Sequence, residues 1–225
     1  MSGATKYLQI IGGLPSADLE KRLAAVEEDL ADLKYEAITV SSFSHNAGTK
    51  ENGDAVTSVV LSWMLSKTPV SLTINGEAIE VTQSGSVTLT GNYTNTTTWT
   101  LKATDDRGAE AEKNTTLYFY DGIYYGCVTK PATVNSAFIM ALPNKKLSGN
   151  KNLSNLSVTG GEGKYFYFAY PTSMGKSKFN IGGFDYDYEY STVSFTNKFG
   201  VTKNYYVYVS GQPILSTISV TVKGG

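Results

Sequence analysis

The chain has 225 residues, of which 17 % are charged, with a formal net charge of −1 at pH 7 and a single cysteine, Cys127. Scattered basic residues and a pI near 5.9 exclude the cationic surface that nucleic-acid binding requires. One cysteine excludes an intrachain disulfide framework. No apolar run approaches the roughly 20 residues of a membrane span. We therefore expect neither a nucleic-acid nor a membrane partner.

Residues 1–15 form a short segment that contains a few apolar side chains and is broken by glycines and Pro15. It is too short for a hydrophobic core of its own, and it lacks the apolar region of a Sec signal peptide. Such a segment is either disordered or ordered by docking on another protein, and we expect a docking tether on a chain that folds in a cytoplasm. The docking candidates are Tyr7, Leu8, Ile10 and Ile11.

Residues 16–37 carry a heptad pattern, in which apolar side chains recur at alternating spacings of four and three. The average period of 3.5 residues keeps these side chains on one face only if the helix winds around a partner. The pattern predicts a coiled coil. Its expected contact residues, which we call the seam, are Leu19, Leu23, Val26, Leu30 and Leu33.

The flanking charges and the seam residues indicate how the copies associate. With Leu23 at position a, a parallel coil places Arg22 near Glu27 of the next chain and Asp29 near Lys34, and both pairs are attractive. Leucine at a with valine at d favours three or four strands over two. We expect a parallel homo-oligomer, a trimer above all. The alternative is a surface helix that folds back on its own domain.

From residue 38 to residue 120 the apolar period changes to two, which is typical of strands. Turn residues separate the strands, and Asn75–Gly76 is the strongest hairpin signal among them. We expect strands at 38–44, 56–65, 69–74, 78–82, 85–90, 98–104 and 110–120. Seven short strands at regular spacing predict an immunoglobulin-like (Ig-like) β-sandwich. The core candidates are Val60, Trp63, Leu65, Leu89, Trp99 and Leu101.

Residues 121–225 predict a second β-sandwich-like domain, with its boundary near Asp121–Gly122 and no helix. The fold class is therefore mainly β, with one N-terminal helix. Strands are expected at 123–128, 135–142, 153–159, 164–170, 177–184, 190–197, 203–210 and 216–222.

Tyrosine is concentrated in the last half of the chain. Exposed tyrosine beside Asn and Ser is typical of adaptable binding surfaces, and flat rings suit the faces of sugars. The alternative, which we favour for most of these residues, is packing in the core or between subunits. The residues are Tyr118, Tyr120, Tyr124, Tyr125, Tyr165, Tyr167, Tyr170, Tyr186, Tyr188, Tyr190, Tyr205, Tyr206 and Tyr208.

Catalytic and metal-binding patterns are weak. His45, the only histidine, falls in a predicted loop, and the chain has no GxSxG motif, so we expect no enzyme. Asp185, Asp187 and Glu189 alternate with tyrosines, which on one strand would place three carboxylates on one face. One strand face does not supply the six to eight oxygens of a calcium site. We expect a half-buried strand with its tyrosines inward, and no metal or cofactor.

The order of parts, two strings and one spaced pattern resemble fibre proteins of tailed bacteriophages. The strings are VVLSWMLSKTPVSLTINGEAI and NTTTWTLKATDDRGAEAEKNTTLYFYDGIYYGC, and the pattern is IGGF, VSFTNKFG and NYYVYVS in succession. The resemblance covers residues 16–222. It implies no enzymatic activity and a homotrimer whose N-terminus sits on a capsid, tail or baseplate protein while the C-terminal domain points outward.

These observations together predict a virion structural protein, assembled in the cytoplasm of the bacterial host. Its expected role is attachment to a host-surface glycan or surface protein, with receptor-binding residues unassigned. Two alternatives remain: a capsid or neck decoration that binds no specific receptor, and a bacterial Ig-like adhesin module.

Overall fold

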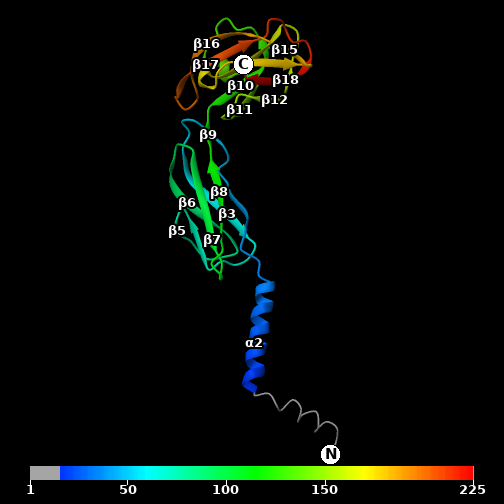
Figure 1. The fold of residues 1–225 in the computed structure, drawn as a ribbon. Coiled ribbons are helices and arrows are strands. Elements are labelled where there is room, and N and C mark those ends of the chain that lie inside the picture. Colours follow the sequence, from blue (N-terminus) through cyan, green and yellow to red (C-terminus); the bar gives the residue numbers. More distant parts are fainter. Residues whose placement is uncertain (1–15, 225) are drawn as a thin grey trace, which may run out of the picture.

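The computed structural model describes residues 16–224, and the predicted docking residues Tyr7, Leu8, Ile10 and Ile11 lie outside that range. The described chain is mainly β. A single long helix, α2 (Ser16–Leu33), extends away from the strands at one end, and two sandwiches follow it in chain order (Figure 1). Among the helices of residues 16–224, none has both the length and the apolar character needed to cross a membrane.

The first sandwich has a three-stranded and a four-stranded sheet, antiparallel throughout. The first sheet has the order β1-β3-β6, with β1 (Val40–His45), β3 (Val56–Leu65) and β6 (Ser84–Tyr93). The second has the order β5-β4-β7-β8, with β4 (Ser71–Ile74), β5 (Glu77–Ala78), β7 (Thr97–Thr104) and β8 (Glu110–Leu117).

The core of the first sandwich lies between these sheets and contains four of the six predicted core residues, Trp63, Leu65, Trp99 and Leu101. Leu89 is partly buried and packs against this core, whereas Val60 does not, so the prediction was wrong for Val60. Side chains alternate along a strand. The phase that buries Trp63 and Leu65 therefore also buries Leu61 and Val59, and it turns Val60 outward.

The second sandwich has a five-stranded and a four-stranded sheet, also antiparallel. The first has the order β11-β10-β13-β17-β16, with β10 (Gly122–Thr129), β11 (Asn144–Leu147), β13 (Lys164–Pro171), β16 (Glu189–Thr196) and β17 (Thr202–Val209). The second has the order β12-β18-β14-β15, with β12 (Leu153–Thr159), β14 (Ser177–Ile181), β15 (Phe184–Tyr186) and β18 (Thr217–Gly224).

The five-stranded sheet is covered on both faces. One face packs on the four-stranded sheet through residues such as Phe166, Phe168 and Phe179. The other face carries Tyr167 and Tyr205 and packs under α3 (Ser136–Met140), whose Ile139 is fully buried. A short 3-10 turn, η1 (Thr172–Met174), follows β13. Burial on both faces explains the almost continuous apolar and aromatic sequence of β13.

The structure corrects two predicted strands of the second sandwich. Residues 135–142 contain the helix α3 instead, because the Asn135 side chain caps it by accepting a hydrogen bond of 3.0 Å from the Phe138 N–H. Residues 177–184 are not one strand. Gly182 and Gly183, with φ of 59° and 90°, form the turn between β14 and β15.

The run of alternating acids and tyrosines at 185–190 is not one strand either. Its first part belongs to β15 in the four-stranded sheet, and its last part belongs to β16 in the five-stranded sheet. Asp187 and Tyr188 connect the two sheets. The predicted arrangement, with all tyrosines on one inward face of a single strand, is therefore wrong.

The two sandwiches meet at a joint formed by two very short strands, β2 (Lys50–Glu51) and β9 (Phe119–Tyr120), which pair in parallel. Glu51, 3 % exposed, accepts a hydrogen bond of 2.9 Å from the Tyr124 hydroxyl and an ion-pair contact of 2.6 Å from Lys145. Gly53, in the first sandwich, packs closely against Val201 of the second sandwich: a Cβ at position 53 would lie 2.6 Å from Cγ2 of Val201. The two sandwiches are therefore held together at the joint by a buried hydrogen bond, an ion pair and close packing.

Helix α2 is attached to the first sandwich through Tyr35, just beyond its end. The Tyr35 hydroxyl donates to Oδ2 of Asp105 at 2.7 Å, and the cationic groups of Lys67 and Arg107 lie over its ring, at 4.4 and 4.5 Å from the ring centre. Arg107 also pairs with Asp32 in the last turn of the helix. These contacts fix the chain where it leaves the helix.

Candidate functional site

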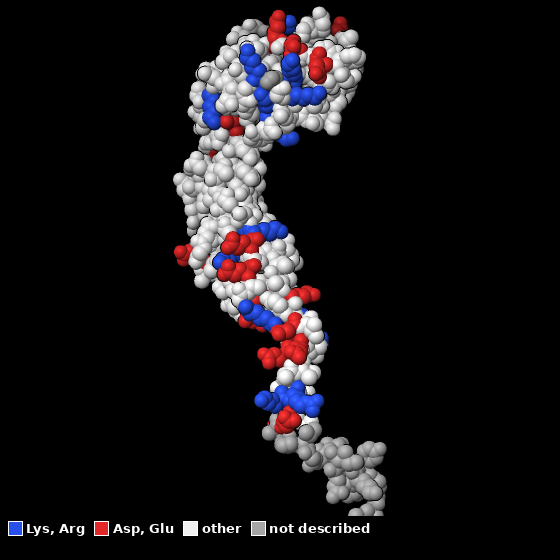
Figure 2. Space-filling model, in the orientation of Figure 1, with Lys and Arg blue, Asp and Glu red and all other residues white. Residues whose placement is uncertain are grey.

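The seam of α2 is the first candidate interaction surface. All five predicted seam residues lie in the helix, and their exposed fractions run from 41 to 84 %. Every described side chain from Asp18 to Lys34 is exposed, so α2 does not fold back on a sandwich. In the view of Figure 2, basic and acidic side chains both flank the helix. Within residues 16–224, the structure therefore leaves the five seam side chains without cover from either sandwich.

Asp105 supports this helix from the turn between β7 and β8. It is buried and also receives Lys67 at 2.9 Å and the Ile38 N–H at 3.2 Å. Desolvation alone would raise the pKa of Asp105, but hydrogen bonds from Tyr35, from Lys67 and from the turn backbone outweigh it and hold the pKa well below its usual range. Asp105 therefore remains a carboxylate that links the helix exit to the first sandwich.

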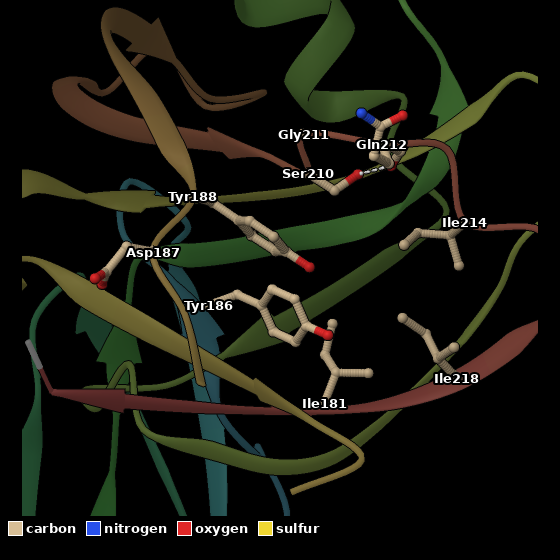
Figure 3. A pocket seen from close by; sticks show the side chains of 9 residues that line it. All are labelled: Ile181, Tyr186, Asp187, Tyr188, Ser210, Gly211, Gln212, Ile214 and Ile218. Carbon is tan, nitrogen blue, oxygen red and sulfur yellow. Dashed lines mark hydrogen bonds between the residues drawn. The ribbon is translucent and has the colours of Figure 1, made fainter. Parts of the chain in front are cut away.

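A groove in the second sandwich is the second candidate, with a volume of about 480 Å³. It lies where the β14–β15 hairpin, the Asp187–Tyr188 connection and the segment between β17 and β18 come together (Figure 3). The lining is mostly apolar, and it consists of Ile181, Tyr186, Asp187, Tyr188, Ser210, Gly211, Gln212, Ile214 and Ile218.

Two tyrosines dominate the groove. Tyr188 stacks on Phe179, with ring centres 5.0 Å apart, and Tyr186 lies beside Tyr188 at 5.9 Å. Figure 3 shows both hydroxyls directed into the hollow, whereas the Asp187 carboxylate points away from it. Burial, followed by the nearby Tyr186, raises the pKa of Tyr188 to about 12, so its hydroxyl stays protonated and available as a donor at neutral pH.

Most other tyrosines of the last half pack in the cores. Tyr124, Tyr167, Tyr170, Tyr205 and Tyr208 are buried, and Tyr125, Tyr165 and Tyr206 are half-buried against the same cores. Tyr170 and Tyr208 stack at 5.9 Å in the core, and the Tyr170 hydroxyl donates to the Gly175 carbonyl at 2.9 Å. Among these tyrosines, Tyr118, Tyr186 and Tyr190 are exposed.

The other residues considered for chemistry have structural roles. His45 ends β1 rather than lying in a loop. Its Nε2–H donates to the Thr116 carbonyl at 3.0 Å while Nδ1 accepts from the Ala47 N–H at 3.2 Å. Cys127 is buried in β10, and burial raises the pKa of its thiol. Within residues 16–224, no group of three or more His, Cys, Asp or Glu side chains is placed to hold a metal ion.

Sequence reasoning missed the groove because its lining comes from two separate segments, residues 181–188 and 210–218. The glycine pair Gly182–Gly183 was the available signal, since consecutive glycines mark a turn that ends a strand. The structure does not bring the seam and the groove together: Figure 1 shows α2 and the second sandwich at opposite ends of the described chain.

Comparison with known proteins places the chain in no family. Neither a family model nor a curated protein matches it.

Proposed function

We propose that this protein is the subunit of a short, parallel homotrimeric fibre on a tailed-phage virion, and that the fibre attaches the particle to the host cell surface. The observation that carries the proposal is the exposed seam of α2. Burying each seam residue against neighbouring copies contributes about 1–2 kcal/mol from apolar surface removed from water. An exposed apolar stripe on a projecting helix is typical of a surface through which identical chains associate.

The strand order of the first sandwich supports the fibre proposal. We assign the sheet β1-β3-β6 to strands A-B-E, and the sheet β5-β4-β7-β8 to strands C′-C-F-G, of an Ig-like sandwich that lacks strand D. Such a module, held at both ends by the Asp105 and Glu51 contacts, serves as a spacer between helix and outer sandwich. Residues 1–15 then dock on the particle, at the end opposite the groove.

The attachment mechanism is avidity. A trimer presents three copies of the outer sandwich in one direction, and many fibres decorate one particle. Linked weak sites of this kind exceed the single-site affinity by roughly 10² to 10⁴ when their geometry permits simultaneous binding. This mechanism needs no perturbed catalytic group and no cofactor.

A cysteine cross-linking experiment tests the parallel arrangement. Leu30→Cys places identical thiols next to each other in a parallel, in-register coil, whereas an antiparallel coil pairs position 30 with the other end of the helix. We expect a disulfide-linked dimer on a non-reducing gel. The control is Glu28→Cys, on the outward face of the same helix, which gives no cross-link. A monomer from Leu30→Cys under the same oxidation contradicts the parallel trimer.

The docking role of the tether has its own test. We expect the chain without residues 1–15 to remain a trimer and to be absent from purified particles. Normal incorporation of this truncated chain would contradict docking through Tyr7, Leu8, Ile10 and Ile11.

A further inference from the structure

One end of the four-stranded sheet, at the β14–β15 hairpin, is not covered by the five-stranded sheet that packs on its inner face. In the β14–β15 hairpin, Phe179 pairs with Tyr186 and Ile181 pairs with Phe184. Residues directly opposite each other in an antiparallel pair point to the same face. Phe184 and Tyr186 therefore extend the face that begins with the fully buried Phe179, yet Phe184 is 72 % exposed.

This uncovered face borders the groove. The volume of the groove, about 480 Å³, lies within the range of roughly 300–1,000 Å³ that is typical of small-molecule sites. Ile181, Ile214 and Ile218 form an apolar wall, and the tyrosine rings lie against it (Figure 3). Leu215, the chain neighbour of Ile214, is 76 % exposed. Flat rings and aliphatic side chains are therefore open at this end of the sandwich.

The polar groups of the groove favour a ligand that has hydroxyls. Of the nine lining residues drawn in Figure 3, only Ser210 and Gln212 are joined by a hydrogen bond, from the serine hydroxyl to the Gln212 carbonyl at 2.7 Å. The hydroxyls of Tyr186 and Tyr188 thus face the hollow without a partner from its lining. A wholly apolar ligand would cover them and leave them unpaired, which is unfavourable.

The lack of positively charged side chains in the lining of the groove argues against an anionic ligand. The nine lining residues include no Lys, Arg or His, so they offer no cation to a sialylated or phosphorylated ligand. The Asp187 carboxylate points away from the hollow and lies 4.0 Å from Lys178. The groove is therefore matched to a neutral ligand.

We propose that this groove binds a neutral oligosaccharide. A pyranose ring has an apolar C–H face that stacks on Tyr186 and Phe184, and hydroxyls at its edge that pair with the Tyr188 and Tyr186 hydroxyls. The assignment rests on the proposed attachment function and deepens it, since it places the host-surface contact at the end of the chain opposite the helix.

An array experiment with the full chain tests the ligand class. The probes are neutral hexose and N-acetylhexosamine oligosaccharides, printed beside sialylated, sulfated and phosphorylated ones. We expect binding to members of the neutral set. Titration with the best neutral glycan then shows an affinity loss of about tenfold for Tyr186→Ala, through lost stacking, and of about fivefold for Tyr188→Phe, through one lost hydrogen bond. Tyr118→Ala, which removes a tyrosine of similar exposure far from the groove, leaves the affinity unchanged.

Three results would overturn the assignment: silence across the neutral set, binding confined to acidic glycans, or equal affinity of Tyr186→Ala and the wild type. None of them concerns the fibre, because the oligomeric state is measured separately. Conversely, a monomeric chain that binds the neutral glycan with the predicted variant pattern supports the groove while contradicting the trimer.

Discussion

Glu51 is the buried carboxylate of the joint, and we expect its replacement by alanine to weaken the contact between the two sandwiches. Its Oε1 accepts the Tyr124 hydroxyl at 2.9 Å and its Oε2 accepts Lys145 at 2.6 Å. Tyr124 is buried, so its hydroxyl has little access to replacement water. Burial, followed by the hydrogen bond to Glu51, raises the pKa of Tyr124, which keeps it a donor.

The size of the effect follows from these contacts. In Glu51→Ala the Tyr124 hydroxyl loses its acceptor while buried, which costs about 1–3 kcal/mol. Lys145 also loses a charge-assisted bond, but its side chain is 32 % exposed and recovers hydration, so we assign it about 1 kcal/mol. The sum is about 3 kcal/mol of unfolding free energy. For a chain of this length, that lowers the melting temperature by about 6–12 °C.

Scanning calorimetry of the purified chain measures this change. The control is Glu110→Ala, which breaks an ion pair of similar length (2.8 Å to Lys102) between side chains that are 39 and 54 % exposed. Such exposed pairs contribute little, so we expect no shift in melting temperature for the control. If Glu51→Ala shifts the melting temperature no more than Glu110→Ala does, the joint is not held by its buried carboxylate.

Two further predictions concern Asp105 and the glycines with positive φ. The folded-state pKa of Asp105 is below its unfolded value of about 4, so its stabilisation is complete above that pH and is lost as the pH falls toward the folded value. The melting-temperature difference between wild type and Asp105→Asn is therefore expected to shrink as the pH is lowered below about 4, and a constant difference would contradict the ionised Asp105. Gly76→Ala meets only backbone strain, with φ of 86° and open space, and we expect a loss of about 1 kcal/mol in denaturant unfolding. Gly53→Ala adds a clash at 2.6 Å with Val201 to a φ of 92°, and equal losses for the two variants would show that Gly53 does not pack against the second sandwich.

Local patterns predicted much of the N-terminal half. The heptad spacing of residues 19–33 gave a helix with one apolar stripe, and the period of two gave most strands of the first sandwich. Two of those predictions were wrong: only Ala78 of the strand expected at 78–82 belongs to a strand, and the strand expected at 110–120 is divided into β8 and β9. The sequence could not decide the phase at Val59–Val60, because both residues are apolar and only the sheet opposite determines which one is buried.

The second sandwich was harder to predict because its central sheet is buried on both faces. A strand such as β13 then shows no alternation, and tyrosines occur on either side of it. Helix α3 was missed although Asn135 is a favourable cap, since its five residues are too few to show a helical period. The groove and the joint depend on pairings between distant segments, for example Lys50 with Phe119, that no local pattern records.

The solution mass of the full chain, measured by light scattering, tests the central claim most directly. We expect three times the 24.3 kDa of one chain for the wild type, and a single chain for the variant with Leu23→Asp and Leu30→Asp. The matched control carries the same two charges on the outward face, as Ala24→Asp and Ala31→Asp, and remains a trimer. A wild-type mass of 24.3 kDa would contradict the fibre.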